Sequence, residues 1–214
     1  MSRILIIGGH GKIALLLAPL LAARGDEVTS VVRNPDHADD VRASGASPLV
    51  LDVAAADTKT LSEAFAGYDA VVWSAGAGGG DAARTYAVDR DAAIRAMDAA
   101  EVAGTSRFVM VSWIGSSPDH GIDPSDSFFP YADAKLAADE HLRRSSLEWT
   151  VLGPGTLTSD EATGHITTEP TGRGEVSRAD VAAVIAATLA DPVTVRRTIR
   201  FGAGDTPIAE ALSA

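Results

Sequence analysis

The chain has no cysteine, few aromatic residues and no long uninterrupted hydrophobic run. Without cysteine it has no disulfide, no thiolate nucleophile and no cysteine-ligated metal, and nothing indicates an oxidising compartment. The longest apolar run, residues 13–23, contains Pro19 and is about half the roughly 20 residues that a membrane-spanning helix needs. The N-terminus leads into a strand-like run rather than a signal peptide. We therefore expect a cytoplasmic protein without membrane contact.

Positive charge is also scarce, because 18 Lys and Arg residues face 29 Asp and Glu residues, for a formal net charge of −11. Such a surface repels the phosphates of nucleic acids, so we expect no nucleic-acid partner. The five histidines show no spacing typical of metal ligands, and no metal site is expected. The length of 214 residues and the 46% of hydrophobic residues favour one globular domain over residues 1–214.

Short β-branched runs alternate with longer alanine-rich stretches along the chain. The expected strands are residues 3–7, 28–32, 49–52, 70–73, 108–112 and 149–152, with 197–201 as a weaker seventh. The expected helices are residues 12–24, 58–66, 89–103, 131–144 and 178–190. This alternation predicts an α/β fold, a doubly wound, Rossmann-like parallel sheet that binds ligands at the carboxyl ends of its strands.

Three segments interrupt this rhythm. The glycine-rich residues 75–81 are expected to be mobile. Residues 115–130, rich in Ser, Asp, Gly and Pro, are long enough for a lid or a binding loop. The irregular residues 153–177 are expected to contribute a small C-terminal cap over the substrate.

A glycine-rich turn joins the first expected strand to the first expected helix. Residues 8–14, Gly-Gly-His-Gly-Lys-Ile-Ala, have the Gly-x-x-Gly-x-x-Ala pattern of a dinucleotide-binding turn. Gly8 permits the tight turn, and Gly11 lets a diphosphate approach the free N–H groups of the helix N-terminus. We also expect Lys12 and Ile13 to contact the cofactor. The alternative is a glycine turn without a ligand, with Lys12 as a surface residue.

The next two strands predict the adenosine half of the site. Arg33 follows the second strand, where chains that prefer NAD carry an acidic residue, so NADP(H) is favoured and NAD(H) remains an alternative. Arg33 could equally be a solvated surface residue. Asp52 is expected at the adenine edge with Val53 beside it, although Asp52 also suits a turn cap. The small Ser74, Ala75 and Gly76 are expected to flank the ribose and the diphosphate.

A Tyr-x-x-x-Lys pair, Tyr131 and Lys135, begins the helix after the fifth strand. Residues four apart share a helix face, so we expect the ammonium near the phenol, where it would lower the tyrosine pKa. Such a tyrosine can pass a proton to a carbonyl oxygen while a nicotinamide delivers hydride. The same spacing also occurs by chance on many helices.

With these features the sequence resembles the short-chain dehydrogenase/reductase superfamily, and more closely its atypical NAD(P)-binding branch of NmrA-like and biliverdin-reductase-B-like proteins. The segments that carry the resemblance are residues 8–14, 32–35, 107–112, 131–135, 147–155 and 177–182. The resemblance implies that Lys135 also binds the nicotinamide ribose and that Ser112 orients the substrate. It also implies that Pro154 and Gly155 hold the nicotinamide.

Two departures from that branch leave the activity open. Trp113 follows Ser112 where a second hydroxyl is common, and Gly153 stands where the branch usually has the arginine of Arg-Pro-Gly. The main hypothesis is an NADP(H)-dependent oxidoreductase acting on a small carbonyl or quinone-like substrate. The alternative is a non-catalytic NADP(H)-binding redox sensor of NmrA-like type. A non-redox epimerase is less favoured, because the chain is short for a sugar-nucleotide pocket. Residues 89–103 and 131–144 are the expected faces of a homodimer.

Overall fold

A twisted, mostly parallel sheet forms the centre of the computed structural model, which describes residues 1–78 and 81–213. The order of its nine strands is β11-β8-β10-β6-β5-β4-β1-β2-β3. The parallel strands are β1 (Arg3–Ile7), β2 (Glu27–Val32), β3 (Ser47–Val50), β4 (Ala70–Trp73), β5 (Arg107–Val111), β6 (Glu148–Pro154) and β10 (Arg197–Ala203). Strands β1 and β4 are apolar throughout their buried length because helices cover both of their faces.

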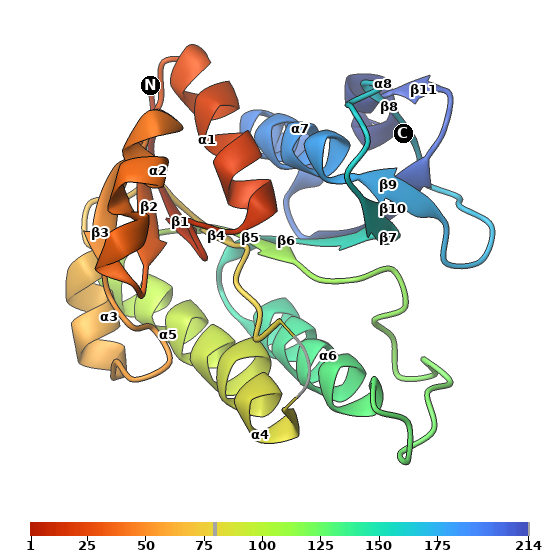
Figure 1. The fold of residues 1–214 in the computed structure, drawn as a ribbon, viewed down its shortest axis with the longest axis horizontal. Coiled ribbons are helices and arrows are strands. Elements are labelled where there is room, and N and C mark those ends of the chain that lie inside the picture. Colours follow the sequence, from red (N-terminus) through yellow and green to blue (C-terminus); the bar gives the residue numbers. More distant parts are fainter. Residues whose placement is uncertain (79–80, 214) are drawn as a thin grey trace.

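Helices pack on both faces of the sheet (Figure 1). One face carries α1 (Lys12–Ala23), α2 (Ala38–Ala43), α7 (Arg178–Ala190) and α8 (Ile208–Ser213), and the other carries α3 (Thr58–Phe65), α5 (Ala93–Ala103) and α6 (Phe129–Arg144). Each layer buries its own hydrophobic cluster against the strands. The predicted doubly wound fold is therefore confirmed.

Two predicted boundaries were wrong. The third strand occupies residues 47–50 rather than 49–52, so Leu51 and Asp52 lie in the loop beyond its carboxyl end. The helix predicted at residues 89–103 begins earlier, as α4 (Ala82–Thr85) and a π-helical segment (Tyr86–Ala92) that continue into α5. The side chain of Asp81 caps it by accepting a hydrogen bond from the Ala83 N–H. Of the stretch expected to be mobile, residues 79 and 80 lie outside the described residues.

The expected cap contains short strands. These are β7 (Thr156–Thr158), β8 (His165–Thr167) and β9 (Glu175–Ser177), and β8 pairs antiparallel with β10 and with β11 (Thr206–Pro207). Asp180, at the start of α7, accepts hydrogen bonds from the backbone of Thr163 and Gly164 and from the Ser177 hydroxyl. This buried carboxylate fastens the cap to α7.

The loop after β5 runs from residue 112 to 128 without a helix or strand, and it projects beyond α6 (Figure 1). It starts at the carboxyl end of the sheet, as expected of a binding loop.

Candidate active site

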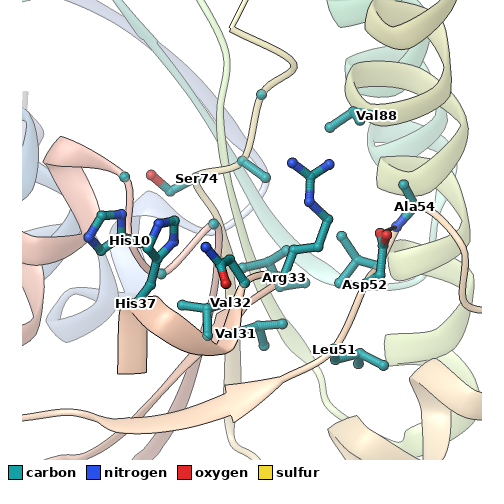
Figure 2. A pocket seen from close by; sticks show the side chains of 18 of the residues that line it. His10, Val31, Val32, Arg33, His37, Leu51, Asp52, Ala54, Ser74 and Val88 are labelled. Atoms are coloured by element: carbon teal, nitrogen blue, oxygen red, sulfur yellow. Dashed lines mark hydrogen bonds between the residues drawn. The ribbon is translucent and has the colours of Figure 1, made fainter. Parts of the chain in front are cut away.

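A pocket of about 350 Å³ lies at the carboxyl ends of β1, β2 and β4 (Figure 2). It gathers most of the residues that the sequence predicted for the cofactor, namely Gly8, Gly11, Arg33, Asp52, Val53, Ser74, Ala75 and Gly76. The other predicted cofactor residues do not line it. These are Lys12, which is exposed, Ile13, which packs in the core, Lys135, Pro154 and Gly155.

The first two glycines of the turn have no room for side chains. Gly8 has a φ of +86°, and a Cβ there would lie 2.7 Å from the backbone of Ala75. A Cβ on Gly9 would lie 2.5 Å from the Cβ of Ser30, so this glycine, to which the motif assigned no role, is also required. Gly11 begins α1, and no side chain caps the first turn of that helix. The turn therefore offers free N–H groups beside a shallow backbone cradle, which fits a diphosphate.

Positively charged and imidazole side chains surround this cradle despite the acidic surface of the protein. Arg33 extends across the pocket toward Val88, while His10 and His37 lie together on its other side (Figure 2). The two imidazole rings stack with their centroids 3.7 Å apart. Arg84 of α4 also lines the pocket and was missed, because its segment was read as a loop. The pocket thus suits an anionic ligand.

Asp52 is a turn cap that also lines the pocket. One of its carboxylate oxygens accepts a hydrogen bond from the Ala54 N–H at 3.0 Å, which is the geometry of a turn cap. The residue also lines the pocket opposite His10 (Figure 2). It is the only acidic residue on the pocket wall within the described part of the chain.

A second cavity, of about 700 Å³, adjoins the first at Gly76. Phe128, Pro130 and Tyr131 from the long loop and α6 form one side of it, and α4 with its cap Asp81 forms another. The ring of Trp113 packs edge-on against Phe128 and lies 6.4 Å from the ring of Tyr131, between centroids. The second cavity is therefore an aromatic-walled space that opens next to the dinucleotide pocket.

The structure places the Tyr-Lys pair differently from the prediction. The Lys135 side chain is 1% exposed, and its Nζ donates a hydrogen bond to the Val111 carbonyl at 2.7 Å. Burial lowers the pKa of Lys135. Loss of solvation, aided by the negative charges of Asp89 and Asp139, raises the pKa of Tyr131. The expectation that Lys135 lowers the Tyr131 pKa was wrong, because the carboxylates and burial outweigh an ammonium that is turned toward β5.

Ser112 is bound to a carboxylate that the sequence analysis missed. The hydroxyls of Ser112 and Ser116 both donate to Oδ2 of Asp139, at 2.5 and 2.6 Å. Asp139 is fully buried, and this burial raises its pKa against the opposing effects of Lys135 and the two hydroxyls. Asp139 lies four residues after Lys135 on α6, so the spacing of the two charges was the available signal.

A second buried carboxylate, that of Asp89, lies in the π-helical segment. Its Oδ2 accepts a hydrogen bond from the Ala77 N–H at 2.9 Å, and its Oδ1 has no hydrogen-bond partner among the described residues. A Cβ on Gly76, where the two cavities meet, would lie 3.2 Å from that Oδ1. Burial raises the pKa of Asp89, and Lys135 counteracts this. A π-turn commonly marks a functional position in a helix.

The Pro154-Gly155 turn lies under the cap. The Ile114 N–H donates to the Pro154 carbonyl at 2.9 Å, which continues the pairing of the β5 and β6 chains beyond the strands. A Cβ on Gly155 would lie 2.6 Å from the Arg173 carbonyl oxygen, so the cap backbone approaches this glycine closely.

Residues 1–78 and 81–213 contain neither a metal-binding cluster nor a membrane-spanning helix. No group of three or more histidine, aspartate or glutamate side chains is placed to hold a metal ion in that part of the chain. None of the helices described there combines the length and the apolar character needed to cross a bilayer.

Comparison with known proteins gives a consistent result. A family described as NAD(P)H-binding matches residues 8–192. A Bacillus subtilis protein named "uncharacterized sugar epimerase YhfK" is 33% identical over 213 residues, covering 98% of each chain. The structure of a "putative NAD-dependent epimerase/dehydratase" from Bacillus halodurans superposes with a TM-score of 0.91 at 35% identity, covering 99% of both chains. The oxidoreductase ylbE of Lactococcus lactis has a TM-score of 0.88 at 28% identity, over 98% of this chain and 94% of its own.

Proposed function

Because this chain belongs to the NAD(P)H-binding family, we propose that it is an NADP(H)-dependent oxidoreductase that reduces a small carbonyl or quinone-like substrate. The observation that carries the proposal is the meeting of the two cavities at Gly76. A dinucleotide on the glycine turn would extend along the strand ends toward this point, and the aromatic cavity begins there. The similarity to an oxidoreductase of Lactococcus lactis supports the same reaction class.

The chain's own residues fit an NADP(H) molecule. The glycine turn and the first turn of α1 would hold the diphosphate, and Asp52 and Val53 would face the adenine. Residues 74–76 would flank the ribose and the diphosphate. Arg33 would pair with the 2′-phosphate, helped by the cationic character of the pocket. When bound, the nicotinamide supplies a hydride to the substrate carbon.

Tyr131 is the proposed proton donor to the substrate oxygen. Its raised pKa keeps the phenol protonated at neutral pH, so it can donate a hydrogen bond to an oxygen that gains negative charge. Trp113 and Phe128 exclude water around it. In this proposal Lys135 and Asp139 hold α6 against the end of β5, and Ser112 acts through Asp139 rather than by touching the substrate.

We expect Arg33→Ala to weaken NADPH binding by about 10- to 100-fold, because a charge-assisted hydrogen bond to phosphate contributes about 1.5–3 kcal/mol. NADH binding should change little. Titration of nucleotide fluorescence with both cofactors measures this, and the surface variant Arg42→Ala is the matched control. Equal affinity of the wild-type protein for NADH and NADPH would contradict the cofactor preference.

Tyr131→Phe should lower kcat for a naphthoquinone or small aldehyde by about 100-fold, the usual size of a general-acid contribution. NADPH affinity should remain unchanged, because Tyr131 lines only the second cavity. Tyr68→Phe is the control, since the Tyr68 hydroxyl bonds to Thr29 on another part of the sheet. Normal turnover of Tyr131→Phe would remove the tyrosine from the mechanism and leave hydride transfer unaffected.

One observation favours a second function, a redox sensor that binds NADP(H) without turnover. The hydroxyl of Ser112 is engaged by Asp139, and the neighbouring Trp113 packs beside the Tyr131 ring. Tight NADPH binding with no NADPH oxidation across carbonyls and quinones would favour the sensor. An epimerase would instead convert its substrate without net oxidation of added NADPH.

A further inference from the structure

Arg200 on β10 and Gly153 on β6 are partners in the parallel register of the two strands. A Cβ on Gly153 would lie 3.3 Å from Cγ of Arg200 and 3.1 Å from the Trp113 carbonyl oxygen. The Arg200 side chain therefore borders the volume that a side chain at position 153 would fill.

The guanidinium of Arg200 binds the turn that follows β5. Its Nη2 donates a hydrogen bond to the Ser116 carbonyl at 2.9 Å. Ser116 is held at two further points, since its N–H donates to the Trp113 carbonyl and its hydroxyl donates to Asp139. The turn over residues 113–116 is thus fastened to β10 on one side and to α6 on the other.

This turn determines where the Trp113 ring lies. The indole folds back over Gly115 so closely that no side chain fits at that position. Its ring is then held against Phe128 and Tyr131, with the guanidinium carbon of Arg173 5.8 Å from its centre. A shift of the turn would therefore displace the Trp113 ring from its place beside Tyr131.

We propose that Arg200 is a positioning residue: its guanidinium, reaching from β10 past Gly153 of β6, holds the turn over residues 113–116 and with it the Trp113 ring, which supports Phe128 and Tyr131 of the substrate cavity. Side chains at positions 153 and 200 would enter the same space. The single arginine at position 200 donates to the Ser116 carbonyl, whereas arginines at both positions would bring two like charges together. The effect on substrate rests on the proposed function, whereas the effect on the turn does not.

The test measures amide hydrogen exchange over residues 113–118 together with the KM for a naphthoquinone and the Kd for NADPH. Loss of the anchoring bond in Arg200→Ala should raise exchange in this segment by about 10-fold and the KM by a similar factor. The NADPH Kd should stay within about 2-fold, because the dinucleotide pocket lies on the β1 side of the sheet.

Two variants separate this role from general stability. Arg196→Ala is the matched control. Arg196 lies just before β10 and its side chain makes a long contact to the Ser146 carbonyl, so its removal should leave exchange over residues 113–118 unchanged. The double variant Gly153→Arg/Arg200→Ala should regain at least about half of the protection from exchange that Arg200→Ala loses over residues 113–118. Gly153→Arg alone should exchange faster in this segment than the wild type.

Three results would overturn the proposal: unchanged exchange in Arg200→Ala, an equal effect of Arg196→Ala, or additive losses in the double variant. If the wild-type protein does not reduce the naphthoquinone, the proposed function fails for that substrate. The exchange measurement then still decides the role of Arg200.

Discussion

Gly11→Asp is expected to weaken NADPH binding by at least about 100-fold while the free energy of unfolding stays near that of Gly11→Asn. Gly11 has a φ of −67° and a ψ of 150°, a conformation that other residues adopt without strain, and it is the N-cap of α1. Aspartate is a favoured N-cap because its carboxylate accepts hydrogen bonds from the first-turn N–H groups. Those are the groups proposed to hold the cofactor diphosphate.

The size of the effect follows from charge. Two unit charges about 4 Å apart repel by about 4 kcal/mol at an effective dielectric constant of about 20, which corresponds to several hundred-fold in affinity. Gly11→Asn adds the same Cβ, which would lie 3.0 Å from the Gly8 carbonyl oxygen, and the same capping side chain without the charge. Gly11→Asn should lose about 10-fold or less in NADPH affinity.

Nucleotide titration and thermal unfolding of both variants measure this difference. Similar losses in Gly11→Asp and Gly11→Asn would mean that bulk, rather than charge, closes the site. Retained NADPH affinity in Gly11→Asp would mean that the diphosphate binds away from the helix N-terminus.

Elements with strong local signals were predicted well from the sequence. The apolar runs of β1 and β4 and the glycine turn need only their own residues to be recognised, because burial on both faces and a tight strand-to-helix turn each leave a local pattern. The start of the helical segment before α5 was missed, because the cap Asp81 stands directly after glycines that indicate a loop. The short strands of the cap have no such pattern. Strand β8, for example, forms through its pairing with β10, which is distant in the sequence.

The site residues divide in the same way. Residues adjacent to the glycine turn and the strand ends reach the predicted pocket because the chain itself carries them there. Asp89 was missed, since only the packed fold brings it close to Lys135, whereas Asp139 lies one turn from that lysine on the same helix and its spacing was overlooked. Arg200 was missed for a related reason: strand register, which the sequence does not state, sets it beside Gly153.

Lys135→Met is expected to reduce the free energy of unfolding by about 3–5 kcal/mol near pH 8, and by less near pH 5, because it removes the cation from a buried charge cluster. In the folded protein Lys135 opposes the raised pKa values of both Asp89 and Asp139. Lys59→Met, which removes a fully exposed lysine paired with Glu63, is the control and should show no such pH dependence.

The direction follows from proton linkage. A carboxyl group whose pKa is raised on folding stabilises the protein at low pH, and this contribution is lost as pH rises from its unfolded value, about 4, through its folded value. Without Lys135 the folded pKa values of Asp89 and Asp139 rise further, so the loss extends to higher pH. The pKa of Lys135 is lowered in the folded protein, so in the wild type stability rises with pH up to the pKa of an unfolded lysine. The substitution removes this rise as well.

Urea unfolding near pH 5 and near pH 8 measures the difference, and Lys135→Met combined with Asp139→Asn tests its cause. The double variant keeps an oxygen that accepts the Ser112 and Ser116 hydroxyls but has one buried charge fewer, so its stability should depend less on pH than that of Lys135→Met. Equal losses at both pH values would show that Lys135 serves α6 by filling volume rather than by balancing the two carboxylates.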